Sequence, residues 1–308
     1  MTVSVIGAVQ LDVIASPVGE LPAPGAALFV DTMAMRVGGA GANAALAMVE
    51  LGLPTRLFGC VGDDFVGRQL LAEIGDLAAD VLVVPGQPTG VTVACEKPGR
   101  DRSFVTLLGV CGTYDFSMIP TDALRSESLL VCDYFCAPAL RGEPTRKLLE
   151  GARAQGARTF FDTAWDPDGF GAQARAEVHD LLPLVDVFLP NEDEACALSG
   201  GSDPHRAAHL LQEVSHGWVV VKLGAAGCYA VGPGGVTFTE PAPKVEVADT
   251  TGAGDTFNAG LVAGLRDGQA LAQALPAALR SAIRFASAVV SRPSSERYAS
   301  RTRSSEPS

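Results

Sequence analysis

Lysine, aromatic residues and charged residues in general are scarce in this chain of 308 residues. Charged residues make up 19% of the sequence and aromatic residues 6%, and the only lysines are Lys97, Lys147, Lys222 and Lys244. Acidic residues outnumber basic ones by 35 to 23, which gives a formal net charge of -12. This charge disfavours a nucleic-acid binder, because such a protein needs a basic stripe to displace counterions from phosphates.

Signals of several other protein classes are also missing. No apolar run reaches about 18 residues without a charge or a break, so the sequence predicts no membrane-spanning helix. The starting segment MTVSVIGAVQ has neither the basic region nor the cleavage site of a secretory signal. The seven cysteines form no Cys-x-x-Cys motif and are odd in number, which favours reduced thiols and a cytoplasmic location. No lysine follows a glycine, which excludes a Walker A loop.

What the chain does contain is enough apolar sequence for a large core, since 47% of its residues are hydrophobic. A first strand is expected at 3–6, a helix from about 41, and a further strand at 55–60. From residue 128 onward, apolar strands such as RTFFDTA and WVVVKLG alternate with helical patterns. This order predicts a doubly wound α/β fold, in which a mostly parallel sheet carries helices on both faces.

Two segments, at about 10–37 and 89–110, do not follow this alternation. They are β-rich, are broken by Gly and Pro, and lack helical periodicity, and residues 80–84 look similar. We therefore expect a small antiparallel sheet that covers the mouth of the main domain as a lid. The main domain spans 1–290 with these insertions, and residues 291–308, which contain seven Ser and four Arg, are expected to form an exposed tail.

The strongest local signal is DTTGAGDTFNAGLVAGL, at 249–265. Gly252, Ala253 and Gly254 leave backbone N–H groups uncovered at a helix N-terminus, where an anion is favoured. Asp255 in the first turn suits a base that takes a proton from a hydroxyl while the N–H groups hold a phosphoryl group. The alternative is a helix cap alone, but the intact Thr-Gly-Ala-Gly-Asp-Thr-Phe run favours phosphoryl transfer.

A second glycine cluster, VGGAGANAALA, contains a Gly-x-Gly-x-x-Ala pattern at Gly39, Gly41 and Ala44. A dinucleotide-binding fingerprint has this form, but it follows the first strand and is succeeded by an acidic residue at a strand end. Here the cluster follows an extended region, and Asp63 and Asp64 stand in a VGDD turn. A dehydrogenase is therefore a remote alternative, which the absence of NADH binding would exclude.

Together the two clusters resemble the signatures of the PfkB (ribokinase-like) carbohydrate kinases. GGAGANAA is followed by GCVGDDFVG, NEDEA fits the family's Asn-x-x-Glu element, and VKLGAAG fits its Gly-x-x-Gly turn. The order and spacing of these motifs agree with those of the family over roughly 3–290. The resemblance implies a doubly wound domain with a small β lid and transfer of phosphate from ATP, with Mg²⁺, to a hydroxyl of a sugar or polyol. Many members also pair through their lids, which implies a homodimer.

The resemblance also implies residue roles. Asp255 is the catalytic base and 252–254 the anion hole, while Asp12, Gly39 and Asn43 contact hydroxyls of the acceptor. Carboxylate and carboxamide groups suit a polyol, because both can bridge neighbouring hydroxyls. The alternatives are a turn residue for Asp12 and a helix cap for Asn43.

The resemblance also implies a nucleotide-binding side of the site. It is formed by Asn191, Lys222, Gly224, Gly227 and Gly254, with Glu194 near Mg²⁺ through water. The alternatives are a capping box for Asn191 and Glu194 and a solvated strand end for Lys222. Asp249 and Thr251 resemble a loop that binds a monovalent cation, K⁺ in this interpretation. Asp162 and Asp166 either arrange phosphates and metal or shape a loop.

The chain departs from well-known relatives at several positions. Ribose kinases carry Lys where this chain has Ala40, and Glu where it has Cys136 and Ala137; the Tyr-x-Arg lid pattern of 2-keto-3-deoxygluconate kinases is absent. SRPSSERYASR replaces the usual last turn and helix, which contribute to the cation site and the adenine pocket. The substrate therefore stays open from the sequence.

Three functions remain after these departures. The first is a kinase of a sugar or sugar-like alcohol. The second is a nucleoside kinase, for which Phe29, Phe104 and Tyr114 are candidates to support a base. The third is a catalytically silent ligand-binding relative, against which the intact Asp255 argues. Arg100 and Arg102 in the expected lid either reach the substrate or stay solvated.

Overall fold

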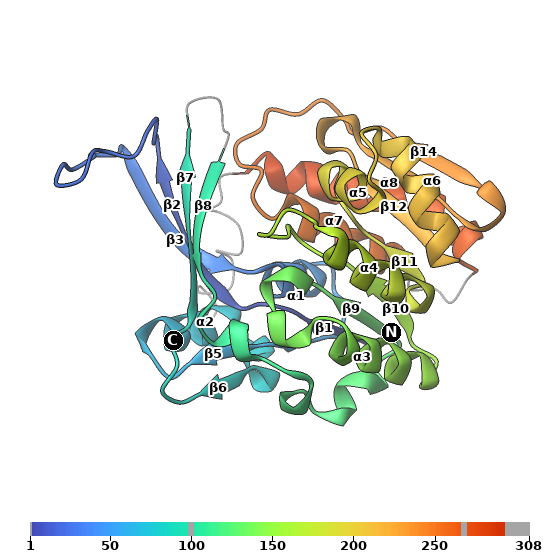
Figure 1. Ribbon diagram of the computed structural model, residues 1–308, viewed down its shortest axis with the longest axis horizontal. Helices are drawn as coiled ribbons and strands as arrows, with labels where there is room; N and C mark the ends of the chain where they lie inside the picture. Colours follow the sequence, from blue (N-terminus) through green and yellow to red (C-terminus); the bar gives the residue numbers. More distant parts are fainter. Residues whose placement is uncertain (1, 98–101, 266–269, 293–308) are drawn as a thin grey trace, which may run out of the picture.

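A central sheet of eight strands runs through the computed structural model, which describes residues 2–97, 102–265 and 270–292 (Figure 1). In sheet order the strands are β14 (Thr237–Glu240), β13 (Cys228–Val231), β12 (Trp218–Lys222), β11 (Val187–Phe188), β10 (Arg158–Phe161), β9 (Ser128–Val131), β1 (Val3–Ile6) and β4 (Thr55–Phe58). From β4 to β12 all neighbours are parallel, and β13 and β14 add an antiparallel hairpin. The predicted mostly parallel sheet is confirmed.

Helices cover both faces of this sheet, because alternate strand residues enter two separate apolar clusters. Val3 and Val5 of β1 belong to one cluster and Ile6 to the other. The first face carries α1 (Ala40–Glu50), α2 (Phe65–Ile74), α7 (Ala253–Gly264) and α8 (Leu271–Val290). The second face carries α3 (Glu143–Ala154), α4 (Ala172–Leu181), α5 (Glu192–Ser199) and α6 (Pro204–Ser215). This is the doubly wound arrangement that the alternation of strands and helices predicts.

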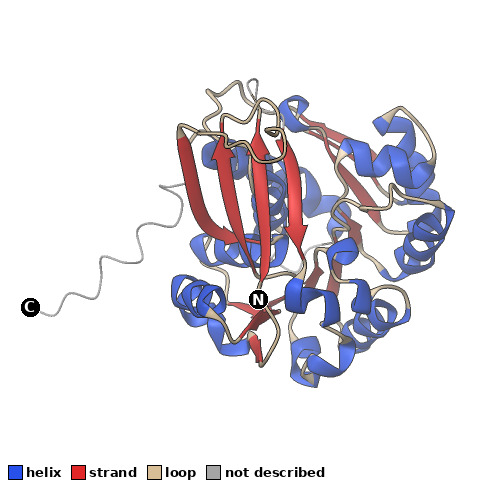
Figure 2. Ribbon diagram, turned by 60° about the vertical axis from the view of Figure 1, so that its left-hand side comes forward, coloured by secondary structure: helices blue, strands red, loops and turns tan. Residues whose placement is uncertain are grey.

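The segments at 10–37 and 89–110 build one small sheet, which stands apart from the helical layers (Figure 2). Its strands in order are β3 (Thr32–Gly38), β2 (Gln10–Ser16), β7 (Gly90–Glu96) and β8 (Arg102–Leu107). The expectation of a wholly antiparallel sheet is wrong, since β2 and β7 are parallel. Both of these strands start at the main domain and run away from it, so their directions agree.

Two strand predictions also need correction. The strand expected at 55–60 is split at Gly59 into β4 and β5 (Cys60–Gly62), and β5 pairs with β6 (Leu82–Val84) in a two-stranded sheet. Residues 80–84 therefore do not join the small sheet. The backbone at Gly59 passes so close to Gly7 that a Cβ atom would lie 2.6 Å from the Gly7 carbonyl oxygen.

Some predictions fall on residues beyond the described ranges. These are Arg100 and, after Arg292, the expected tail. Within the described ranges, no helix has both the length and the apolar character needed to cross a bilayer.

Candidate active site

The turn that opens α7 is held by its own side chains. Asp249 Oδ1 accepts hydrogen bonds from the amide and the hydroxyl of Thr251, both at 2.8 Å. Gly252 then caps α7 with a φ of 71°, a left-handed conformation that glycine adopts without strain. Of the amides predicted for the anion hole at 252–254, that of Ala253 donates to the Thr250 carbonyl at 3.2 Å, so the first-turn amides directed out of the helix end are those of 254 and 255.

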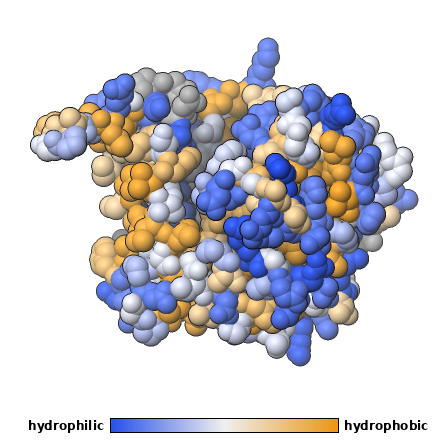
Figure 3. All heavy atoms as spheres, in the orientation of Figure 1, coloured by the Kyte–Doolittle hydropathy of each residue, from blue (hydrophilic) through white to orange (hydrophobic). Residues whose placement is uncertain are grey.

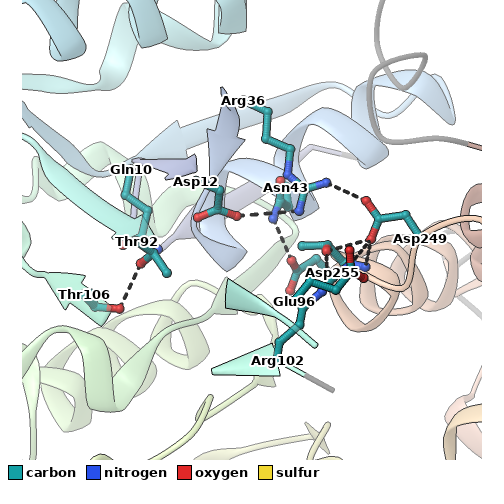
Figure 4. Close-up of polar contacts among 11 residues, drawn as sticks. Gln10, Asp12, Arg36, Asn43, Thr92, Glu96, Arg102, Thr106, Asp249 and Asp255 are labelled. Atoms are coloured by element: carbon teal, nitrogen blue, oxygen red, sulfur yellow. Dashed lines mark hydrogen bonds and ion pairs between the residues drawn. The ribbon is translucent and has the colours of Figure 1, made fainter. Parts of the chain in front are cut away.

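Asp255 lies in the first turn of α7 and meets the first turn of α1. The Asn43 side-chain amide donates to Asp255 Oδ2 at 3.0 Å (Figure 4). The approach depends on Gly39, which caps α1 with a φ of 86°; a Cβ atom there would lie 2.3 Å from the Ala8 carbonyl oxygen. The structure thus brings the two glycine clusters of the sequence to one place, and Asn43 bonds a carboxylate rather than its own helix.

Burial changes the acidity of Asp255. Loss of solvent, and then the nearby Asp162, raise the pKa of this carboxyl, Asn43 and Lys222 oppose the rise, and the resulting pKa is about 6. A carboxylate with this pKa is ionised at neutral pH and accepts a proton more readily than an exposed aspartate does.

Next to this carboxylate lies a buried polar network. Lys222 Nζ donates to Asp162 Oδ2 at 2.7 Å, and the Asn258 side-chain amide donates to the same oxygen at 2.5 Å. Lys222 is therefore not a solvated strand end. A Cβ atom added at Gly254 would lie 3.5 Å from Lys222 Nζ, so the ammonium group faces the end of α7.

Sequence analysis offers the same two alternatives for Asp162 and Asp166, but the two side chains have different roles in the structure. Asp162 accepts from Lys222 in the network, and Asp166 accepts from the amides of Asp168 and Phe170 and so shapes a loop. Asn258 had no sequence prediction, although its place one turn after Asp255 on α7 put it near the site.

Asn191 and Glu194 form the capping box of α5. The Asn191 side chain accepts from the Glu194 amide at 2.8 Å, and the Glu194 carboxylate accepts from the Asn191 amide at 2.9 Å. Asn191 also bridges to Lys222 in the sheet, which brings the box to the buried network. Burial, and then Asp162, raise the pKa of Glu194 to about 7. A nearby cation would stabilise the ionised form of a carboxyl group in these surroundings.

A cavity of about 580 Å³ opens on the other side of Gly254. Its polar end includes Lys222, Gly224 and Gly227. Its apolar walls include Val245, Phe257, Ile283, Ala286 and Val290. The sequence reading did not find the wall residues of α8, because the segment after this helix departs from the family pattern; the apolar stripe of α8 was the available signal.

A row of polar residues on the small sheet faces α7 across the mouth of the main domain. Asp12 is in register with Arg36 on one side and Thr92 on the other, and Thr92 bonds Thr106 at 3.0 Å (Figure 4). Burial raises the pKa of Asp12, while Arg36 opposes the rise. Arg36 was not predicted, although alternation along β3 gives it the same face as Asp12 across the strand pair.

Arg102 reaches from β8 to the turn before α7. One of its nitrogens lies 2.8 Å from Asp249 Oδ1, and another donates to the Thr251 hydroxyl. Arg102 therefore does not stay solvated. Asp249 and Thr251, the residues that the family resemblance links with a monovalent cation, contact this guanidinium.

The three aromatic residues proposed as a base platform differ in exposure. Tyr114 is buried in the core at 4% exposed and is unavailable to a ligand, whereas Phe104 is 63% exposed. Register places Phe104 on the face of β8 that also carries Arg102 and Thr106, which is the face directed at the mouth. Phe29 is exposed in the loop before β3.

For a metal, the described ranges contain no group of three His, Cys, Asp or Glu side chains arranged to hold an ion by themselves. Asp162 and Glu194 are buried carboxyls near Lys222, and their chemistry suits a hydrated cation that is held partly by other ligands.

Comparisons with known proteins all point to one family of kinases. The profile of the pfkB family of carbohydrate kinases matches residues 2–301. An aminoimidazole riboside kinase of Salmonella typhimurium is 32% identical over 236 residues, 73% of this chain and 72% of the relative. A 2-dehydro-3-deoxygluconokinase of Thermoproteus tenax is 30% identical over 273 residues, 83% and 81% of the two chains. Among solved structures, a ribokinase II from E. coli in complex with ATP and Mg²⁺ covers 94% of this chain and 92% of its own at 24% identity, with a TM-score of 0.76, which shows a shared fold.

Proposed function

This chain belongs to the PfkB family of carbohydrate kinases, and from that premise we propose that it phosphorylates a hydroxyl group of a sugar or nucleoside with ATP. The single observation that carries the proposal is the contact between the two glycine clusters, in which Asn43 at the start of α1 bonds Asp255 at the start of α7. This contact puts a half-buried carboxylate beside a helix N-terminus that favours an anion.

Asp255 acts as the base in the proposed mechanism. Its carboxylate takes the proton of the acceptor hydroxyl as the oxygen attacks phosphorus, while Asn43 fixes the orientation of the carboxylate. The amides at Gly254 and Asp255 stabilise charge on the phosphoryl oxygens, and Lys222 adds a positive charge beside them. In-line transfer places the acceptor toward Asp12 and Asn43 and the leaving nucleotide on the opposite side.

The rate should follow the ionisation of Asp255. We expect kcat/KM to fall as pH drops through about 6, because the base is then protonated, and to level off above about pH 7. In Asn43→Ala the hydrogen bond that lowers the Asp255 pKa is lost, so the acid limb should move to higher pH. Rates measured from pH 5 to 8 test this; a flat wild-type profile, or a shift to lower pH in the variant, contradicts it.

ATP is proposed to lie in the cavity of about 580 Å³, with its base between the apolar residues of α8 and its phosphates toward Lys222, Gly224, Gly227 and Gly254. Asn191 bridges to Lys222 at this phosphate end, and Glu194 and Asp162 suit Mg²⁺ held largely through water. Bound Mg²⁺ would neutralise phosphate charge. The ribokinase II solved with ATP and Mg²⁺ supports this pair of cofactors.

A bulky side chain in this cavity should weaken nucleotide binding selectively. In Ala286→Trp we expect the KM for ATP to rise by about tenfold or more, because the indole fills space on the wall. The KM for the acceptor is the internal control and should change little, since the acceptor lies beyond Gly254. Steady-state kinetics with each substrate varied would show it, and equal rises in both constants would place ATP elsewhere.

The acceptor is proposed to be a neutral polyol. Asp12, Gln10 and Thr92 offer acceptors and donors for hydroxyls on the small sheet, and Phe104 stands beside them as an exposed ring suited to a base. Relatives that act on a riboside and on a sugar acid keep both sugars and nucleosides in the test. An ADP-release assay on a panel of sugars and nucleosides decides between them, and no turnover of any acceptor, with ATP bound, favours a silent binding protein.

The small sheet is proposed to act as the lid of this site, and a second copy of the chain is proposed to cover its outer face. On that face Met35, Val13, Val93 and Val105 are in register, and Met35 and Val105 are 73% and 64% exposed. Figure 3 shows apolar residues on the side where this sheet lies. Pairing of two such faces would remove a large apolar surface from water.

The free cysteines fit the proposed location in the cytoplasm.

A further inference from the structure

Arg102 makes three polar contacts, two of which join the small sheet to the main domain. Its guanidinium lies 2.8 Å from Asp249 Oδ1 and 3.1 Å from Glu96 Oε1, and it donates to the Thr251 hydroxyl (Figure 4). The side chains of Arg102 and Asp249 are each 10% exposed. Little solvent therefore screens this ion pair.

The direction of the arginine is set within the small sheet. Glu96 and Arg102 are register partners on β7 and β8, and the Glu96 carboxylate holds the guanidinium from behind. A planar guanidinium can bind two oxygens at fixed spacing, which a lysine ammonium does not reproduce. Arg102 thus reaches the main domain in a defined orientation.

The oxygen that Arg102 contacts is the one that shapes the turn before α7. Asp249 Oδ1 accepts from both the amide and the hydroxyl of Thr251, and the chain continues directly into Gly252 and the helix end. The second carboxylate oxygen, Oδ2, lies 3.2 Å from Arg36 of β3. Two arginines of the small sheet therefore occupy the one carboxylate of this turn.

These contacts do not fit the monovalent cation that the family resemblance implies for Asp249 and Thr251. A K⁺ ion on the same side-chain oxygens would meet the positive charge of Arg102 and would have to displace it. A guanidinium bound there already balances the carboxylate and keeps the turn closed. The chain thus carries a cation of its own at this place.

Accepting the kinase function proposed above, we propose that Arg102 is a positioning residue which holds the 249–252 turn, and through it the phosphate-binding end of α7, in place of K⁺. Phosphoryl transfer then needs no monovalent cation. It does need the small sheet to be closed on the main domain, because the arginine belongs to that sheet.

The test compares the wild type with Arg102→Met, Arg102→Lys and the matched control Arg68→Met, whose arginine pairs with Asp63 on the exposed surface. Hydrogen exchange is measured first, on ligand-free protein. In Arg102→Met the amides of 251–256 should exchange at least about tenfold faster, while those of α3 stay unchanged, because opening is local. Arg102→Lys should lie between, and Arg68→Met should match the wild type.

Kinetics with the best acceptor of the panel are measured in KCl and in tetramethylammonium chloride at equal ionic strength. Wild-type kcat should differ by less than about twofold between the salts. Arg102→Met should lose about 10- to 100-fold in kcat, as expected for a misplaced anion site, with a smaller change in acceptor KM and partial recovery in KCl.

Three results would overturn the proposal: a wild-type enzyme that needs K⁺, unchanged exchange at 251–256 in Arg102→Met, or equal losses in both salts with exchange raised throughout the protein. The exchange experiment needs no substrate. Lack of turnover with every acceptor would therefore defeat the kinase proposal and leave the role of Arg102 decided by exchange.

Discussion

Asp255→Asn is expected to bind ATP as the wild type does but to turn over about 10²–10⁴-fold more slowly, which is the usual contribution of a general base. The asparagine keeps an oxygen for the Asn43 amide, so the geometry of the site should persist. Turnover of the confirmed acceptor and calorimetric ATP binding measure the two effects. The exposed Asp63→Asn serves as the control, and near wild-type turnover in Asp255→Asn would remove Asp255 from the role.

The same substitution should stabilise the protein at high pH. The pKa of Asp255 is about 6 in the folded protein, above its ordinary value of 3.8, so the folded state binds this proton more tightly than the unfolded state. Above pH 6 the buried charge therefore costs about 3 kcal/mol, at about 1.4 kcal/mol per pKa unit. Removing it should raise Tm at pH 8, and the gain should shrink as pH falls through 6 toward 4. A lower Tm at pH 8 would contradict this account.

Lys222→Met is the second substitution with a large expected effect. It leaves Asp162 and the nearby Glu194 buried without their cation, and the loss of one partner of a buried ion pair typically costs about 3–5 kcal/mol. Urea unfolding should show this loss, and kinase turnover should fall as well, because the ammonium faces the end of α7.

A double variant separates the charge from the packing. Lys222→Met with Asp162→Asn removes both charges, so it should recover part of the stability lost in the single variant. Lys147→Met, at an exposed position, is the matched control and should unfold like the wild type. If Lys222→Met were as stable as the wild type, the buried ion pair would not be a main contribution to the free energy of unfolding.

Much of this molecule could be predicted because the signals are local. Apolar strands that alternate with helices indicate a mostly parallel sheet with helices on both faces, and the Thr-Gly-Ala-Gly-Asp run marks the start of α7 before any contact is known. The small sheet was also predictable as a unit from its lack of helical period. Its parallel pair was not, because strand direction depends on where each strand leaves the main domain.

The contacts between side chains were harder to foresee. Arg102 and Asp249 are 147 positions apart, and nothing in the sequence around either residue indicates the other. Asp162 and Asp166 follow the same strand with the same side chain, and only the distant Lys222 and Asn258 distinguish Asp162, which joins the network, from Asp166, which shapes the loop. The apolar stripe of α8 is visible in the sequence, but its packing against the turn before α7, through hydrogen bonds from the amides of 248 and 249 to the carbonyl of 290, is not.

The parallel pair of the small sheet has a consequence for how the chain folds. Residue 10 pairs with residue 90, so joining β2 and β7 closes a long loop that contains β4, β5 and α2. Closing such a long loop costs entropy before any strand contact offsets it, which slows non-local pairing. We therefore expect the small sheet to form after the main sheet and to open before it. A chain that starts to unfold would then lose the small sheet while the cavity beside Gly254 is still formed.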